Sequence, residues 1–134
     1  MLLRTSGFEQ APSHIRAHAV TFCLIPRILF SASDDKHIHM YDVDNKSLIC
    51  AMSGHASWVL SIDVSPDGVA IPTGSSDRTV MLWDLSMRSV VQTMTNHTDH
   101  VWGVAFRATG TFGSRAGRLA SVSDDKSISL YDFT

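Results

Sequence analysis

The sequence predicts an all-β fold built from three copies of one unit, and three observations support this prediction. The text DDKHIHMYD at 34–42 returns as SDRTVMLWD at 76–84 and as DDKSISLYD at 124–132. Short segments with alternating apolar residues, such as SIDV and GVAF, are followed by turn residues, as in strands that end in tight turns. TVMLWDL is apolar on both faces, which is typical of a sheet covered on both sides.

The spacing of equivalent residues defines the repeat. Asp77 follows Asp35 by 42 residues, and His97 follows His55 by the same 42. Asp125 follows Asp77 by 48, because the third unit carries six extra residues near TFGSRAG. Such an insertion costs little in a loop, since the entropy of loop closure grows slowly with length. A period near 42 with about four short strands per unit predicts β-propeller blades stacked face to face.

These patterns delimit the units. The second unit covers 54–85 and the third covers 96–134, and in each an alternating apolar segment precedes a turn. The first unit is recognisable only over its end, 30–43. Residues 1–29 are expected to form an irregular segment with remnant strands, in which VTF at 20–22 keeps the apolar alternation.

Composition argues against several classes of protein. The net charge is −2 and the pI is about 6.3, so direct binding of nucleic acid or of an anionic membrane is not expected. The most apolar window, AVTFCLIPRILF, is short and contains Pro26 and Arg27, whereas a membrane span needs roughly 20 apolar residues. Cys23 and Cys50 are too few for a disulfide framework and are expected to pack as apolar residues.

A family resemblance rests on the second unit. GHASWVLSIDVSPDGVAIPTGSSDRTVMLWD resembles a WD repeat, which begins with Gly-His and ends with Trp-Asp. The third unit is similar from His97 onward, with Tyr131 in place of the Trp. The resemblance covers about 13–134 and implies an all-β, partial, open WD-repeat β-propeller of about three blades.

The resemblance also implies a hydrogen-bonded chain within each blade, formed by a His, a Ser or Thr, the turn Asp and the Trp. A buried imidazole and a buried carboxylate each need partners, and a satisfied network fixes strand register. Where Tyr replaces Trp, the indole donor is missing and the network is expected to be weaker or rearranged. The implied residues are His55, Thr73, Asp77 and Trp83 in the second unit, His97, Ser121, Asp125 and Tyr131 in the third, and Ser31, Asp35 and Tyr41 in the first.

The same residue types occur in nucleophilic triads, but the structural interpretation is favoured. The set recurs once per repeat, whereas a catalytic site should occur once, and neither G-x-S-x-G nor a phosphate-binding loop is present. We expect no enzyme activity and no cofactor. His37 and His39 would share a strand face, as metal ligands can, but no third ligand has motif-like spacing, so no metal site is predicted.

In WD propellers, partners usually bind the face reached by the residue before each blade's first strand and by the residue before the turn Asp. Carried onto this chain, these positions are Arg16, Asp34, Trp58, Ser76, His100 and Asp124. A Trp with acidic neighbours suits a peptide with an aromatic or arginine anchor. Packing between blades is expected for Trp102, while packing and exposure are both open for Trp58.

Three segments allow a finer resemblance within the family. SGHASWVL, NHTDHVWGVAF and RAGRLASVSDDKSISLYD resemble the end of the WD-repeat subunit shared by the polymerase-associated-factor (Paf) elongation complex and the superkiller (Ski) complex, in its plant, vernalization-independence form. This resemblance implies a seven-bladed, non-catalytic scaffold that joins protein subunits in transcription elongation and RNA decay, in nucleus and cytoplasm.

Two expectations qualify that resemblance. The alternative function is another WD-repeat adaptor, such as a substrate receptor of a ubiquitin ligase. Because three units cannot make seven blades, the chain is expected to be a truncated copy whose open blade edges favour self-association.

Overall fold

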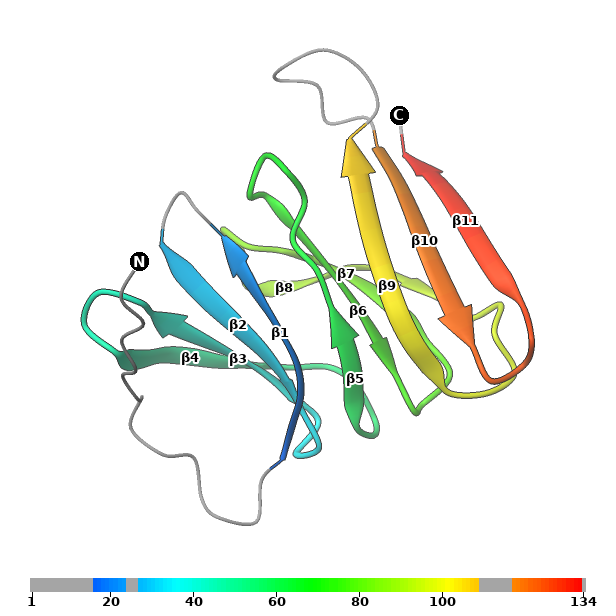
Figure 1. The fold of residues 1–134 in the computed structure, drawn as a ribbon, viewed down its shortest axis with the longest axis horizontal. Coiled ribbons are helices and arrows are strands. Elements are labelled where there is room, and N and C mark those ends of the chain that lie inside the picture. Colours follow the sequence, from blue (N-terminus) through cyan, green and yellow to red (C-terminus); the bar gives the residue numbers. More distant parts are fainter. Residues whose placement is uncertain (1–15, 24–26, 109–116, 134) are drawn as a thin grey trace, which may run out of the picture.

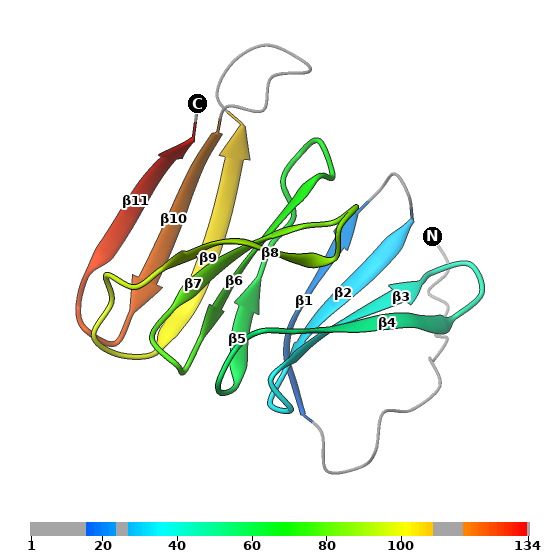
Figure 2. The ribbon, with the colours of Figure 1, turned by 180° about the vertical axis from the view of Figure 1, so that it is seen from behind.

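The computed structural model describes residues 16–23, 27–108 and 117–133, and this part of the chain contains strands and no helix. The strands form three antiparallel sheets that stand side by side in chain order (Figures 1 and 2). The expected all-β, open and partial propeller is confirmed. Within the described residues, no helix is long and apolar enough to cross a membrane.

Each sheet is a meander in which neighbours in space are neighbours in sequence. The first sheet consists of β1 (Ala17–Cys23), β2 (Ile28–Ser33), β3 (His37–Asp42) and β4 (Ser47–Ser53). The second consists of β5 (Val59–Ile62), β6 (Ala70–Ser75), β7 (Val80–Asp84) and β8 (Ser89–Met94). The third consists of β9 (Val101–Ala108), β10 (Gly117–Ser123) and β11 (Ile128–Phe133). The first strands β1, β5 and β9 contact one another in sequence, as the inner strands of propeller blades do.

The first sheet includes a strand from residues 1–29, the segment in which remnant strands are expected. β1 lies inside that segment and pairs with β2 from Ala17 opposite Ser33 to Cys23 opposite Ile28. The first unit therefore has four strands rather than only its end. Residues 1–15 and 24–26 lie outside the described residues, as does most of the insertion near TFGSRAG, at 109–116.

Two apolar clusters join the three sheets. Each cluster combines side chains from the facing surfaces of two neighbouring sheets, and burial of one such side chain contributes roughly 1.5–3 kcal/mol. Between the first and second sheets the cluster includes Phe30, Ile38, Met40, Val59, Ile71 and Trp83. Between the second and third sheets it comprises Val80, Met94, Val101 and Leu119. Cys23 is buried in the first cluster and Cys50 packs against it, as apolar residues do.

The second and third sheets also fit closely around Gly74 on β6. A Cβ at this position would lie 2.7 Å from Cγ1 of Val101 and 2.6 Å from Oγ of Ser61. A hydrogen bond from backbone to side chain adds a polar link, because the amide of Phe106 on β9 donates to Oδ2 of Asp63 at 2.8 Å. Gly74 therefore allows a close approach of the sheets that any larger residue would disturb.

The turns between the second and third strands of the sheets share one backbone conformation. Lys36, Arg78 and Lys126 have φ angles of 74°, 72° and 70°, in the left-handed region that is costly for residues with a Cβ. In each turn the Asp before this residue offsets the cost of the left-handed backbone with a side-chain hydrogen bond. Its Oδ1 accepts from the amide two residues later, at 3.0 Å in the first sheet, 2.9 Å in the second and 2.9 Å in the third.

The outer face of the third sheet is apolar and exposed. Trp102 and Ile128 are 49% and 73% exposed, although their counterparts in the second sheet, Leu60 and Val80, are 4% and 0% exposed. The expected packing of Trp102 between blades is therefore wrong for this structure. Its side chain lies on a surface that resembles an interface between sheets but that has no neighbouring sheet among the described residues.

Candidate protein-interaction face

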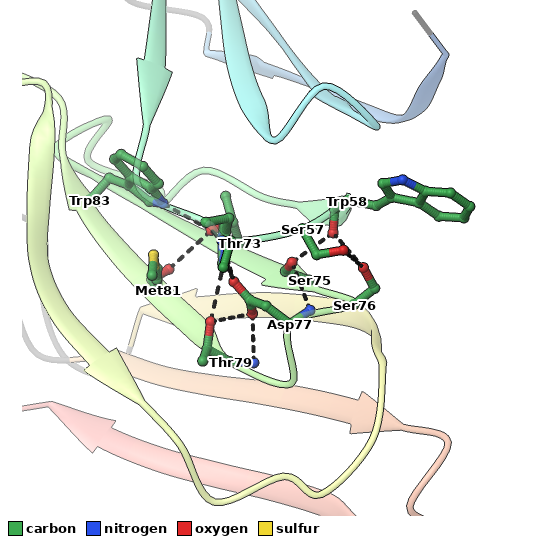
Figure 3. A network of polar contacts seen from close by, with 11 residues as sticks. Ser57, Trp58, Thr73, Ser75, Ser76, Asp77, Thr79, Met81 and Trp83 are labelled. Carbon is green, nitrogen blue, oxygen red and sulfur yellow. Dashed lines mark hydrogen bonds and ion pairs between the residues drawn. The ribbon is translucent and has the colours of Figure 1, made fainter.

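A buried chain of hydrogen bonds runs through the second sheet (Figure 3). His55 lies before β5. Thr73 on β6, Asp77 in the following turn and Trp83 on β7 are labelled in Figure 3. Nδ1 of His55 lies 2.9 Å from Asp77 Oδ2, and Nε2 lies 2.7 Å from Thr73 Oγ1. The indole N–H of Trp83 donates to the same Thr73 oxygen at 2.8 Å. The structure thus joins all four residues named from the sequence, and both nitrogens of the imidazole are used.

The carboxylate of Asp77 ties the loop before β5 to the turn after β6. Besides His55, it accepts from the amide of Ala56 at 3.0 Å and from the amide and hydroxyl of Thr79. Burial raises the pKa of Asp77, but the hydrogen bonds from His55, Thr79 and Ala56 outweigh this and hold the pKa well below its usual range. Asp77 is therefore an ionised structural acceptor that fixes the loop carrying Trp58.

The third sheet has the same network with a different ending. His97 bonds Asp125 at 2.8 Å and Ser121 at 2.7 Å. The hydroxyl of Tyr131 lies 3.5 Å from Ser121 and donates instead to Asn96. Hydrogen bonds from the hydroxyl of Ser127 and from the imidazole of His97 lower the pKa of the Asp125 carboxyl well below its usual range, and they outweigh burial, which raises this pKa. With Tyr in place of Trp, the last hydrogen bond of the network is therefore made to Asn96 instead of to the hydroxyl on the second strand.

The first sheet departs from the chain expected for Ser31, Asp35 and Tyr41. Oδ2 of Asp35 bonds Nε2 of His39 at 2.8 Å, and the ring of His39 stacks on Tyr41. Ser31 is buried on β2. The ring Nδ1 of His37 bonds the backbone carbonyl of Asp35 at 2.8 Å. His39, on the third strand, thus takes the place at the turn Asp that His55 and His97 occupy in the other sheets. The role of His39 was not predicted from the sequence, because the WD-repeat pattern has no His on the third strand.

The six residues predicted to face partners lie at one end of the sheets. In each sheet the amide of the residue before the turn Asp donates to the carbonyl of the residue before the first strand, at 2.9, 2.9 and 3.0 Å. The pairs are Arg16 with Asp34, Trp58 with Ser76, and His100 with Asp124. One backbone contact therefore brings the six positions together in pairs, beside the turns that hold the buried networks.

A pocket of about 220 Å³ opens on this face, lined by Ser57, Trp58, Ser76 and His100. The side chain of Trp58 is 51% exposed, and its indole points away from the buried network (Figure 3). Its ring stacks on that of His18 from β1, with centroids 5.8 Å apart and planes 22° apart. The open question about Trp58 is thereby settled in favour of exposure.

Two carboxylates lie beside this pocket. Ligand atoms of Asp99, His100 and Asp124 lie within 4.8 Å of one another, a residue set that can also hold a divalent cation. Asp99 and Asp124 are exposed, and the amide of His100 donates to Oδ1 of Asp99 at 2.7 Å. Asp99 was not predicted from the sequence as a residue of this face, although it directly precedes His100, which was.

Comparison with known proteins identifies the repeat. Residues 46–84 and 88–132, more than half of the chain, match the family described as "WD domain, G-beta repeat". The chain is 34% identical over 96 residues to Superkiller complex protein 8 of Dictyostelium discoideum, covering 70% of this chain and 30% of that protein. It is 30% identical over 112 residues to human Striatin-3, covering 81% of this chain and 14% of that protein. The chain therefore spans less than a third of the length of either relative.

A solved structure shows the same fold. The structure of U3-55K matches with a TM-score of 0.73 at 24% identity, over 88% of this chain and 38% of that one. This likeness concerns the fold alone. The three meandering sheets, the buried network of the second and third sheets and the family match over more than half of the chain lead to one conclusion: the chain belongs to the WD-repeat family.

Proposed function

We propose that the chain is a non-catalytic protein-interaction scaffold that binds partner subunits through the face around Trp58. The observation that carries this proposal is the contrast between two tryptophans of one sheet. Trp83 is 1% exposed and bonded within the network, whereas Trp58 is 51% exposed beside a pocket. An exposed aromatic side chain on a rigid support is the type of residue that dominates binding energy in protein interfaces.

The geometry supports a scaffold rather than an enzyme. The side chains of His55 and His97 are 0% and 1% exposed, and each uses both ring nitrogens in hydrogen bonds. A general base must reach the proton that it removes, and neither imidazole has a free nitrogen facing solvent. The same arrangement occurs in two sheets, as expected for a structural device.

The complex is proposed from similarity. The relative at 34% identity is named as a protein of the superkiller complex, and the match covers 70% of this chain. Together with the resemblance of SGHASWVL and NHTDHVWGVAF, this supports a scaffold of the kind shared by the superkiller and polymerase-associated-factor complexes, in the plant vernalization-independence form. Such a scaffold would act in RNA decay in the cytoplasm and in transcription elongation in the nucleus.

Co-purification tests the proposal. The tagged chain is mixed with purified subunits of the two complexes, and with a cullin and its linker protein as the competing class. We expect capture of superkiller or elongation-complex subunits, and loss of most of that capture in Trp58→Ala with an unchanged circular dichroism spectrum. Met87→Ala is the control, because it removes an exposed apolar side chain between β7 and β8 that does not line the pocket. Capture of the cullin and linker alone would overturn the assignment in favour of a ubiquitin-ligase receptor.

A further inference from the structure

We propose that two copies of this chain close into one ring of six sheets, in which the first sheet of each copy packs on the third sheet of the other. The second sheet lies between the first and the third (Figures 1 and 2), so each of these two turns one broad face outward. The inference is independent of the proposed function, because Trp58 lies before β5 at the ends of the sheets and not on either broad face.

The outer face of the first sheet, here called the leading face, is apolar and open. It carries Val20 and Phe22 of β1, which are 60% and 61% exposed. Phe22 lies opposite Leu29 of β2, and Leu29 lies opposite Tyr41 of β3. Residues directly opposite each other share one face of a sheet, so these side chains form a row across it. A contiguous apolar patch of this kind marks an interaction surface.

The outer face of the third sheet, here called the trailing face, is the second apolar surface. It carries Trp102 of β9, Val122 of β10, and Ile128 and Leu130 of β11. Val122 and Leu130 are 42% and 66% exposed, and Val122 lies opposite Ile128. Among the described residues, no sheet packs on either the leading or the trailing face. Each chain therefore has two apolar faces that need a cover.

The leading face has the register of the surface by which the second sheet packs on the first. Within one chain, Ile62 and Trp83 of the second sheet are 7% and 1% exposed in the apolar cluster between those two sheets. Val20 and Tyr41 stand 42 residues before them, at the same places in the repeat. The leading face therefore carries apolar residues where the second sheet contacts its neighbour.

The trailing face has the register of the opposite side of that junction. The first sheet presents Ile38 and Met40 to the second, and they are 0% and 2% exposed. Ile128 and Leu130 stand 90 residues after them, at the same places in the repeat. A leading face of one copy and a trailing face of another therefore repeat the two halves of a junction that each chain already contains.

Side-chain size supports this match. Three pairs of equivalent positions face each other across the junctions, and one member of each pair is a phenylalanine while the other is smaller. The pairs are Phe30 with Val64 at the first junction, Pro72 with Phe106 at the second, and Ala120 with Phe22 at the proposed one. A packed interior tolerates exchanges that conserve total volume. Phe22 is thus large where the trailing face offers the small Ala120.

The number of sheets selects a dimer. A head-to-tail contact between identical chains either repeats without end or closes into a ring. β-Propellers close with about four to eight blades. The described residues of one copy supply three sheets, so two copies supply six and three copies supply nine. Two copies are therefore the number that closes, and the ring covers the leading and trailing faces of both chains.

Analytical ultracentrifugation of the whole chain tests the inference. We expect one discrete species of twice the 14.7 kDa mass of the chain, which does not grow further as the concentration rises. The leading-face variant Val20→Ser/Phe22→Ser and the trailing-face variant Ile128→Ser/Leu130→Ser should each dimerise at least about tenfold more weakly, because each alters both junctions of the ring. Circular dichroism verifies that both variants are folded.

A matched control and a mixing experiment identify the faces. Met87→Ser/Val91→Ser removes two side chains that are 68% and 53% exposed on the second sheet and the turn before its last strand, and it should stay dimeric. The leading-face variant keeps its trailing face and the trailing-face variant keeps its leading face. When mixed, they should form a one-to-one pair through one intact junction, at a concentration at which each alone is a monomer.

A measurement on the unaltered chain covers the case in which a variant does not fold. The indole N–H signal of Trp102 in NMR spectra should shift on dilution, because its surroundings change when the trailing face is uncovered. The signal of Trp83 should stay in place, because that residue is buried within one chain. A Trp102 signal that does not change while the dimer dissociates would place the contact elsewhere.

Four other outcomes would overturn the inference. The first is a monomer at every concentration at which the chain is folded. The second is a series of growing oligomers, which would show an open stack instead of a ring. The third is a dimer that persists in the folded leading-face variant, which would join two trailing faces. The fourth is a mixture of the two folded variants that does not associate.

Discussion

The indole N–H of Trp83 donates to the hydroxyl oxygen of Thr73 over 2.8 Å, and neither side chain is accessible to water. The corresponding pair in the third sheet is looser, since the hydroxyls of Tyr131 and Ser121 are 3.5 Å apart. Trp83 and Tyr131 occupy the same position of the repeat, but only Trp83 makes a short hydrogen bond to the hydroxyl on the second strand of its sheet.

Trp83→Phe should lower the free energy of unfolding by about 1–3 kcal/mol, because it leaves the buried oxygen of Thr73 without one of its donors. Tyr131→Phe should cost less, since its hydroxyl lies 3.5 Å from Ser121 and its hydrogen bond to Asn96 is exposed, so water can replace that partner. Urea denaturation of both variants followed by circular dichroism measures the difference. Equal losses at the two positions would contradict the account of the network.

The stability of the chain should fall in acid through Asp77. Its pKa in the folded state is lowered from the usual 3.8, so its contribution is complete above the unfolded value and is lost as the pH falls toward the folded value. We expect stability to be constant above about pH 5 and to decline below about pH 4. Asp77→Asn should be less stable at pH 7 and show a shallower decline. Parallel pH profiles for the two proteins would show that another group controls acid unfolding.

Gly74→Ala should separate the second and third sheets. The new methyl group would meet Val101 at 2.7 Å, and Val101 is fully buried, so overpacking should cost about 1–3 kcal/mol. Gly103→Ala is the control, because its close neighbour is Val122, at 2.9 Å, which is 42% exposed and has room to move. Thermal unfolding of both variants tests this, and a larger loss in Gly103→Ala would refute the packing argument.

The chain should self-associate through its exposed sheet faces. Ile128 and Leu130 are 73% and 66% exposed on the third sheet, and stacked repeats gain stability mainly from their interfaces. We expect a concentration-dependent sedimentation coefficient that decreases in Ile128→Ser/Leu130→Ser. The control is Arg107→Ser, an exposed polar residue of the same sheet. A monodisperse monomer with a sharp cooperative melt would show that these faces are covered within the chain.

The repeat period predicted most of the architecture, because identical spacings impose identical strand registers on successive sheets. The networks of the second and third sheets could be placed from the sequence for the same reason. β1 was harder to predict, since its inward positions hold the small or polar Ala19 and Thr21 while the apolar Val20 and Phe22 face outward. The exposure of Trp102 could not be predicted, because it depends on whether another sheet covers that face rather than on local sequence.

The basic residues with a left-handed backbone in the turns affect the order in which the sheet folds. Arg78 has a φ of 72°, so the hairpin of β6 and β7 lacks the local backbone preference that a glycine would give. Its turn is held by Asp77, whose carboxylate also binds His55 from 22 positions earlier in the chain. Closing the hairpin and docking the loop before β5 should therefore belong to one kinetic step. Mutations at Thr79 and His55 should then give similar φ-values in refolding experiments, whereas a high value at Thr79 alone would show that the hairpin nucleates independently.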